Sequence, residues 1–157
     1  DFETIAILGW GTDDAQARMD NLLTGYADGT VLDAVLSPND SLALGITNSL
    51  QAAGYTLENF PIITGQDCDV TNTKNIILGY QAMSVFKDTR ILAAQVVAMV
   101  DAILKGEEVV INDTTTYDNG VFVIPTNLST PVFANAENYK ELLIDSGYYT
   151  EADLAID

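Results

Sequence analysis

The pattern of hydrophobic and polar residues predicts short strands alternating with amphipathic helices along most of the chain. Short apolar runs rich in Val, Ile, Leu and Phe predict buried strands at residues 3–8, 31–36, 62–63 and 82–86. Apolar residues at helical spacing predict helices at 14–25, 40–54, 70–78 and 90–105, each ending at or just before a glycine. This alternation predicts βαβ units, and therefore an α/β fold with a parallel open sheet flanked by helices.

The pattern is different in the last third of the chain. Tyr117–Gly120 has the composition of a turn, and the apolar run at 121–124 predicts a further strand. Two prolines bracket an extended link at 125–131. Asn135 predicts the start of a last helix, which a glycine ends at position 147.

Composition narrows the classes of function. The chain has 23 acidic and 6 basic residues, and its net charge of −17 disfavours nucleic acid and anionic membranes as partners. A hydrophobic content of 48% excludes a disordered chain. With no His, one Cys and no Gly-rich phosphate loop, the sequence lacks the residues for imidazole catalysis, a His-ligated metal or a nucleotide site. We therefore expect no enzyme, no metal and no cofactor.

Polar residues follow three of the predicted strands. Asn39, Asp67 and Lys87 each come shortly after a strand ends, at the edge of an open parallel sheet where ligands bind. An amide, a carboxylate and an ammonium group can together donate to and accept from adjacent hydroxyl groups. We expect the three side chains to point into one open hollow and to bind a polar small molecule, a sugar.

Each of these residues also has an ordinary structural explanation. Asn39 and Asp67 could cap the helices that follow them, and Lys87 could be a solvated surface lysine. Trp10 lies between two glycines and could either fill the core or cover the C–H face of a sugar. These alternatives are open at the level of the sequence.

Several segments, in order and at matching spacing, carry a family resemblance. They are Ala17–Leu23, Val35–Asp40, Thr64–Asp67, Val85–Thr89, and Asn112–Thr114 with Thr116–Gly120. Together they resemble the periplasmic monosaccharide-binding proteins of ABC transporters, within them the xylose-binding and multiple-sugar-binding branch of the ribose-binding-protein class.

The resemblance implies two α/β lobes joined by three crossings, with the sugar in the cleft between them. Residues 1–157 would form the second, C-terminal lobe of this type I periplasmic binding protein fold, with 82–113 belonging to the first lobe, which is otherwise missing. The family's ligand residues match Asn39, Asp67 and Lys87, and its aromatic residue is matched by Trp10. The implied partners are a sugar and the membrane subunits of the transporter. The implied location is extracytoplasmic, as a periplasmic protein or a cell-surface lipoprotein. The chain opens on Asp without Met or a signal peptide, as an excised piece would.

Two alternative functions remain. A receiver-type regulatory domain also alternates strands and helices, and Asp13, Asp14 and Lys87 imitate its acid pair and late lysine. The ligand-binding half of a sugar-responsive repressor has the same fold as a transport protein.

The helix predicted at 90–105 is the most apolar in the chain. Apolar residues cover more than one of its faces, and exposing a Val, Leu or Ile side chain forgoes roughly 1.5–3 kcal/mol. We expect this helix either to fold back on its own sheet or to bury itself in a homodimer. The second outcome is favoured, because the family topology directs the helix away from the second lobe.

Overall fold

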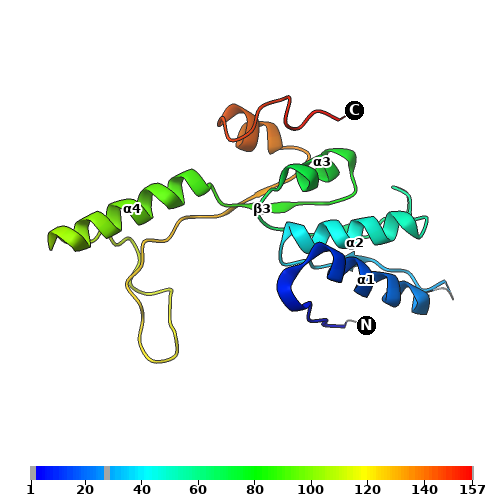
Figure 1. Cartoon of the computed structure of the whole chain (residues 1–157), viewed down its shortest axis with the longest axis horizontal. Coiled ribbons are helices and arrows are strands. Elements are labelled where there is room, and N and C mark those ends of the chain that lie inside the picture. The colour runs from blue at the N-terminus through cyan, green and yellow to red at the C-terminus, as the bar shows by residue number, and fades with distance from the viewer. Residues whose placement is uncertain (1–2, 27–28, 157) are drawn as a thin grey trace. The chain divides into compact units, whose positions relative to one another are not determined.

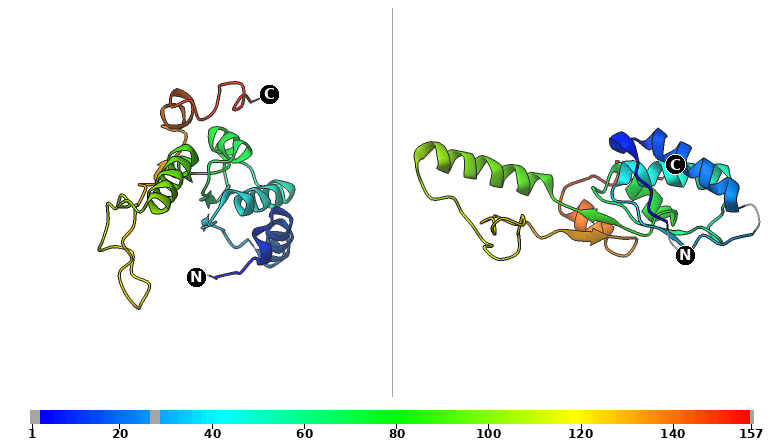
Figure 2. Two further views of the ribbon diagram at one scale, coloured as in Figure 1. Left: turned by 60° about the vertical axis from the view of Figure 1, so that its left-hand side comes forward. Right: turned by 90° about the horizontal axis from the view of Figure 1, so that it is seen from below.

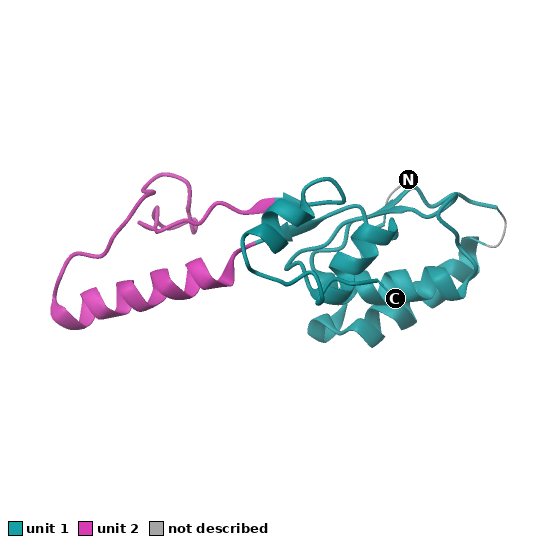
Figure 3. Cartoon of the chain, turned by 90° about the horizontal axis from the view of Figure 1, so that it is seen from above, with its two compact units in different colours: residues 1–86, 133–157 teal, residues 87–132 magenta. Residues whose placement is uncertain are grey.

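The computed structural model describes residues 3–26 and 29–156. The chain divides into two compact units, shown in different colours in Figure 3. The first unit comprises residues 1–86 and 133–157, and the second comprises Lys87–Val132. Among the described residues, no helix has both the length and the apolar character needed to cross a membrane.

Two helices of the first unit, α1 (Thr12–Leu23) and α2 (Asp40–Ala52), pack side by side (Figures 1 and 2). They are in close contact at Gly45, where an added Cβ would lie 2.1 Å from the carbonyl oxygen of Thr12. The first turn of α1 therefore lies against the middle of α2. The 3₁₀ turn η1 (Leu8–Trp10) precedes α1. A second 3₁₀ turn, η2 (Thr24–Tyr26), follows α1.

The strands are short and follow one another across the first unit. β1 (Ala34–Val35) pairs in parallel with β2 (Ile62–Ile63), in the register Ala34 with Ile62. Beyond β2 the chain runs parallel to β3 (Ser84–Phe86), where a parallel bridge joins Gln66 to Val85. β3 in turn pairs with β4 (Val132–Ala134). Helix α3 (Val70–Leu78) connects β2 to β3. The predicted α/β fold with parallel strands is therefore confirmed.

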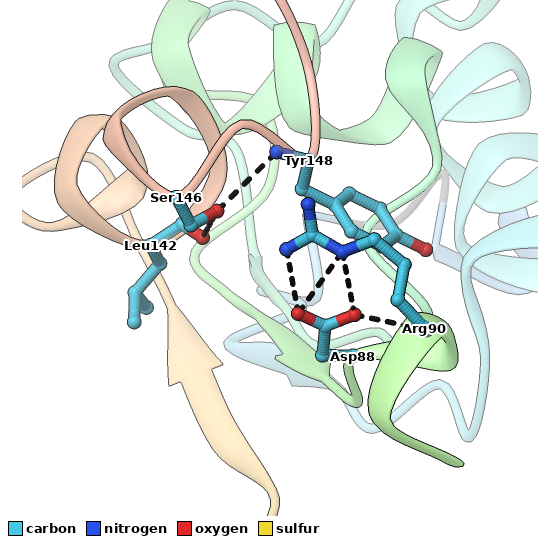
Figure 4. A network of polar contacts seen from close by, with 5 residues as sticks. All are labelled: Asp88, Arg90, Leu142, Ser146 and Tyr148. Carbon is cyan, nitrogen blue, oxygen red and sulfur yellow. Dashed lines mark hydrogen bonds and ion pairs between the residues drawn. The ribbon is translucent and has the colours of Figure 1, made fainter. Parts of the chain in front are cut away.

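Two apolar clusters form the core of the first unit. The first lies between α1, α2 and β2 and consists of the buried side chains of Met19, Ala43, Leu50 and Ile63. The second lies between the end of β2, β3, β4 and the π-helical segment η3 (Lys140–Asp145), with the buried side chains of Cys68, Phe86, Ala134 and Leu143. Phe86 also packs edge-to-face on Tyr148, at a ring-centroid distance of 4.8 Å. Figure 4 shows the Ser146 hydroxyl closing the end of η3 on the Leu142 carbonyl, at 2.7 Å.

The second unit consists of one long helix and an irregular return segment. α4 (Thr89–Lys105) begins at an Asp88 side chain that accepts from the Arg90 N–H at 3.0 Å and also pairs with the Arg90 guanidinium at 2.6 Å (Figure 4). It ends at Gly106, which has the positive φ of 72° that favours glycine. No residue of α4 is buried. The return segment holds only isolated bridges among its described residues, such as that between Asp118 and Val123.

Several predicted elements differ from those observed. The strand predicted at 3–8 is absent: the described residues there make no ladder, although Ile7 has extended dihedral angles. The strand predicted at 121–124 is reduced to one bridge. β4 lies directly after the extended link predicted at 125–131, at residues for which no strand was predicted. In each case the decisive factor is whether another strand lies alongside, which the local sequence pattern does not specify.

Candidate functional site

The loops that carry Asn39 and Asp67 leave the sheet at the same edge. Asn39 follows β1 and Asp67 follows β2, and these two strands are parallel. A backbone hydrogen bond from the Asp40 N–H to the Gln66 carbonyl, at 2.9 Å, joins the two loops directly. The structure thus brings the Asn39 and Asp67 segments together at the carboxyl end of the sheet, as predicted.

Asn39 is the N-cap of α2. Its Oδ1 accepts the Leu42 N–H at 3.0 Å, so the capping explanation is correct. This bond uses the acceptor of the carboxamide and fixes which way the group is turned. Within the described residues the Nδ2 amino group makes no hydrogen bond. Capping therefore fixes the direction of the Nδ2 donor, and the role of Asn39 as a ligand stays a prediction.

Asp67 and Cys68 have unusual backbone conformations. Their φ angles are 107° and 57°, in the region where residues other than glycine are strained. Asp67 is exposed, and its N–H donates to the Val85 carbonyl at 2.9 Å. The residue at the N-cap position of α3 is Asp69, not Asp67. Asp67 is therefore not at the cap position of α3, and its role as a ligand stays a prediction.

Trp10 and Lys87 are placed differently. Trp10 ends η1 with φ 56° and is 57% exposed, which excludes the core-filling explanation within this structure. Lys87 is half-buried, directly follows β3 and opens the second unit. Its predicted convergence with Asn39 and Asp67 stays a prediction, as does sugar contact by either residue.

A buried polar network beneath these loops was not predicted. Asp40 is fully buried, and its Oδ1 accepts from Gln81 Nε2 at 3.0 Å while its Oδ2 accepts from the Asp69 N–H at 2.8 Å. The Ser84 hydroxyl lies 2.8 and 2.9 Å from the two oxygens. Asn72 Nδ2 donates to the Asp40 carbonyl at 2.9 Å and to Gln81 Oε1 at 2.8 Å. Two features of the sequence could have indicated this network. Ser84 lies inside the apolar run of a predicted strand, and Asp40 lies beside the predicted cap residue Asn39.

Gly65 is required by this network. A Cβ at position 65 would lie 2.0 Å from Asp40 Oδ1 and 2.5 Å from Gln81 Nε2. Gly65 itself does not have a positive φ. The absence of a side chain matters here because the carboxylate occupies that space, not because the turn needs glycine.

Burial sets the electrostatics of the network. It raises the pKa of Asp40 from 3.8 to about 6, against the opposing effect of the hydrogen bonds from Gln81, Ser84 and Asp69. The pKa of Asp69 is raised by burial and by the charge of Asp67. Burial also raises the pKa of Cys68 to about 12. Among the described residues no group of three or more acidic or Cys side chains could hold a metal ion.

Comparison with known proteins identifies the family. The family described as periplasmic binding protein domain matches residues 2–108. The chain belongs to this family. Its fold is similar to that of an ABC transporter solute-binding protein from Clostridium phytofermentans with bound β-D-glucose. The TM-score is 0.88 at 60% identity, over 99% of this chain and 48% of that one.

Two relatives among the periplasmic binding proteins bind sugars. The multiple sugar-binding periplasmic protein SbpA of Azospirillum brasilense is 49% identical over 96% of this chain and 42% of its own length. The D-xylose-binding periplasmic protein of Escherichia coli is 34% identical over 93% of this chain and 42% of its own. This chain thus spans less than half the length of the relatives it matches. The resemblance drawn from the sequence, down to the xylose and multiple-sugar branch, is confirmed.

The receiver-type alternative does not fit the structure. Asp13 and Asp14 lie in the first turn of α1 and are exposed. A phosphate-accepting acid pair in an open α/β sheet would lie at the carboxyl ends of strands. These acids stabilise the start of the helix instead, through its dipole.

Proposed function

We propose that this chain forms the second, sugar-binding lobe of an extracytoplasmic solute-binding protein that serves an ABC transporter. The observation that carries the proposal is the likeness to a structure with bound β-D-glucose over nearly the whole chain. The position of the Asn39 and Asp67 loops at the same edge of the sheet supports the proposal independently. A monosaccharide is the proposed ligand, and the transporter's membrane subunits are the proposed partners.

The proposed roles follow from hydrogen-bonding chemistry. Asn39 would donate from Nδ2 to a hydroxyl oxygen, because its Oδ1 is occupied by the cap. Asp67 would accept from two hydroxyls, and Lys87 would donate to a third. Trp10 would cover the C–H face of the ring. The location would be the periplasm or, with a lipid anchor, the cell surface.

The proposed domain assignment places residues 82–113, approximately, with the first lobe. In the structure the second compact unit runs from Lys87 to Val132. Because the relatives are about twice as long as this chain, we propose that the site is completed by a first lobe like theirs. The isolated chain would then bind sugar weakly.

A calorimetric titration tests the function. It uses the intact protein, meaning the two-lobe protein proposed above, with D-glucose, D-xylose and D-galactose as ligands. Asn39→Ser keeps a capping side chain and removes the amide donor, so affinity should fall about tenfold or more with little change in stability. Asp67→Asn should weaken binding by a similar factor, because it removes the charge of an acceptor. Asn48→Ala, on the same helix, is the control and should bind normally. Absence of binding to any hexose or pentose would contradict the proposal.

We also propose that the exposed face of α4 mediates association with a second copy of this chain. Val97, Ile103 and Leu104 are 69%, 64% and 81% exposed, and no residue of α4 is buried. Of the two outcomes expected from the sequence, burial of this helix on its own sheet is not seen among the described residues. Where the proposed first lobe does not cover α4, a second copy would take these apolar side chains out of water.

Sedimentation of the 157-residue chain over a range of concentrations tests this association. Val100→Glu should shift the chain toward monomer, because it places a charge in the apolar face. Val121→Glu makes the same change at an exposed apolar residue outside α4 and should leave association unchanged. A monodisperse monomer at all concentrations would refute the proposal.

A further inference from the structure

We propose that Asp40 is a positioning residue of the sugar site, whose buried carboxylate holds the loops of Asn39 and Asp67 in the geometry that the ligand needs. The reference to a ligand rests on the proposed function. The hold on the two loops depends only on the geometry of the first unit and can be tested without sugar.

Asp40 fastens the β2–α3 loop at two points. Its backbone N–H donates to the Gln66 carbonyl at 2.9 Å, and its Oδ2 accepts the Asp69 N–H at 2.8 Å. Asp67 and Cys68 lie between these two anchors and have the strained φ angles. Strained backbone persists only where its surroundings over-determine it. The two bonds from one residue supply that constraint, and Asn39 is the neighbouring residue in the chain.

Ser84 connects the Asp40 carboxylate to Cys68, one of the two residues with strained φ angles. Its hydroxyl lies within hydrogen-bonding distance of both Asp40 oxygens and accepts the Cys68 N–H at 3.0 Å. From the other side, the Tyr149 hydroxyl donates to the Cys68 carbonyl at 2.9 Å. The peptide groups of residue 68 are therefore fixed on both faces, and the chain of contacts runs back to the Asp40 carboxylate.

The carboxylate is needed because its two oxygens face donors. Asn72 holds the Gln81 amide with Oε1 toward Asn72, so Gln81 Nε2 must face Asp40. An Asn at position 40 would place its own amino group against either Gln81 Nε2 or the Asp69 N–H. In either orientation a buried donor would meet a donor.

Stability alone does not explain this charge. Asp40 is fully buried and, in the described part of the chain, its carboxylate accepts hydrogen bonds from neutral donors. Burying a carboxylate among neutral groups costs free energy, which is why its pKa is raised. What the carboxylate provides is geometry: one group that fixes α2, the β2–α3 loop and β3 together.

The test compares Asp40→Asn with the unmodified intact protein by amide hydrogen exchange and by D-glucose calorimetry. We expect the Asp69 and Cys68 amides to exchange at least about tenfold faster, and the affinity to fall about tenfold or more, because hydrogen bonds to a charged group are lost. Ser49→Ala is the matched control. It removes a buried hydroxyl that bonds Asp20 between α1 and α2, so it lowers stability without reaching the site.

A pH profile separates positioning from a general structural role. In the unmodified protein, affinity should decrease as the pH falls through about 6, because protonation puts a hydrogen on an oxygen that accepts one. The acids facing Asp40 are Asp69 and, beyond it, Asp67, and the nearby Cys68 thiol does not titrate in this range. Asp69→Asn should retain the step, and Asp40→Asn should lose it.

The outcomes distinguish the two proposals. Failure of the unmodified protein to bind sugar would remove the proposed function, and exchange at Asp69 would still decide whether Asp40 holds the loop. Normal exchange and normal affinity in Asp40→Asn would overturn the inference. If Asp40→Asn does not fold, Ser84→Ala keeps the carboxylate but removes one donor to it and the acceptor of the Cys68 N–H. The Asp69 amide, which donates to Asp40 rather than to Ser84, should then exchange faster to a smaller extent than in Asp40→Asn, and the affinity should fall less.

Discussion

Helices α2 and α4 are built from similar side chains but differ in burial. α2 has 13 residues, and its buried residues include Leu42, Ala43 and Leu50. α4 has 17 residues and a longer apolar stripe, yet none of its residues is buried. Local sequence determines that both are helices. What lies against the helix determines whether its apolar face is covered, and that information is outside the helix.

Carboxyl groups in the two units also differ in burial, and their pKa values are shifted in opposite directions. In the first unit Asp40 is buried, and its pKa is raised. In the second unit Asp113 lies in a surface turn, where hydrogen bonds from Thr116 and Thr115 lower its pKa. Burial penalises the charge at the first site, and exposed backbone donors stabilise it at the second. The Asp40 carboxyl thus belongs to a buried polar interior in the first unit, whereas Asp113 in the second unit accepts its hydrogen bonds within its own turn.

The largest effect is expected at Gly45, where the two helices of the first unit meet. Gly→Ala inside a helix ordinarily stabilises by roughly 0.5–1 kcal/mol. Here the new Cβ would lie 2.1 Å from the Thr12 carbonyl oxygen and 2.9 Å from the Gln16 nitrogen. Both atoms are backbone, so α1 must move, and we expect a loss of about 3 kcal/mol or more. Chemical denaturation measures it.

Gly25→Ala is the control for this substitution. Gly25 has no positive φ, and an added Cβ would have no neighbour within 4 Å, so Ala there should be neutral or slightly stabilising. Equal stabilities of the two variants would show that α1 does not depend on its contact with α2.

The sequence predicted local features well and tertiary features poorly. The bounds of α3 and β2 were predicted at the residues where they occur, and α4 begins one residue before its predicted start at residue 90, because caps, periodicity and glycine stops are local. The Asn39–Asp67 edge was predictable because parallel strands end together. The Asp40 network was not, since it joins residues up to 44 positions apart. The strand predicted at 3–8 failed for the same reason, as it needed a partner that the described chain lacks.

The next effect in size is the pH dependence of stability, which should have opposite signs at Asp40 and Asp113. The pKa of Asp40 is about 6 in the folded chain and 3.8 as reference, so folding takes up a proton between these values. Its contribution is greatest below pH 4 and is lost as the pH rises through 6, by at most about 3 kcal/mol. The pKa of Asp113 is lowered, so its contribution is present at neutral pH and lost on acidification.

Denaturation of Asp40→Asn and Asp113→Asn across this pH range measures the two contributions as differences from the unmodified chain. Taking the difference from the unmodified chain cancels the contributions of the other acids to the pH dependence. These include Asp88 and Asp153, whose pKa values are also lowered. The same sign for both differences would mean that Asp40 is not buried as described.

The smallest effect is expected at Asp88, the N-cap of α4. Its side chain accepts the Arg90 N–H at 3.0 Å and pairs with the guanidinium of the same residue at 2.6 Å. Asp88→Ala loses both interactions and should cost about 1 kcal/mol, whereas Asp88→Ser keeps a cap and should cost less than about 0.5 kcal/mol. Because no residue of α4 is buried, tertiary packing does not compensate for a lost cap. Far-ultraviolet circular dichroism should therefore show reduced helix content for Asp88→Ala and not for Asp88→Ser.

Asn39→Ser, at the cap of the packed helix α2, is the control and should leave helix content unchanged. If Asp88→Ala also left it unchanged, α4 would have to be held by contacts beyond its own sequence, and the contrast between the two helices would fail.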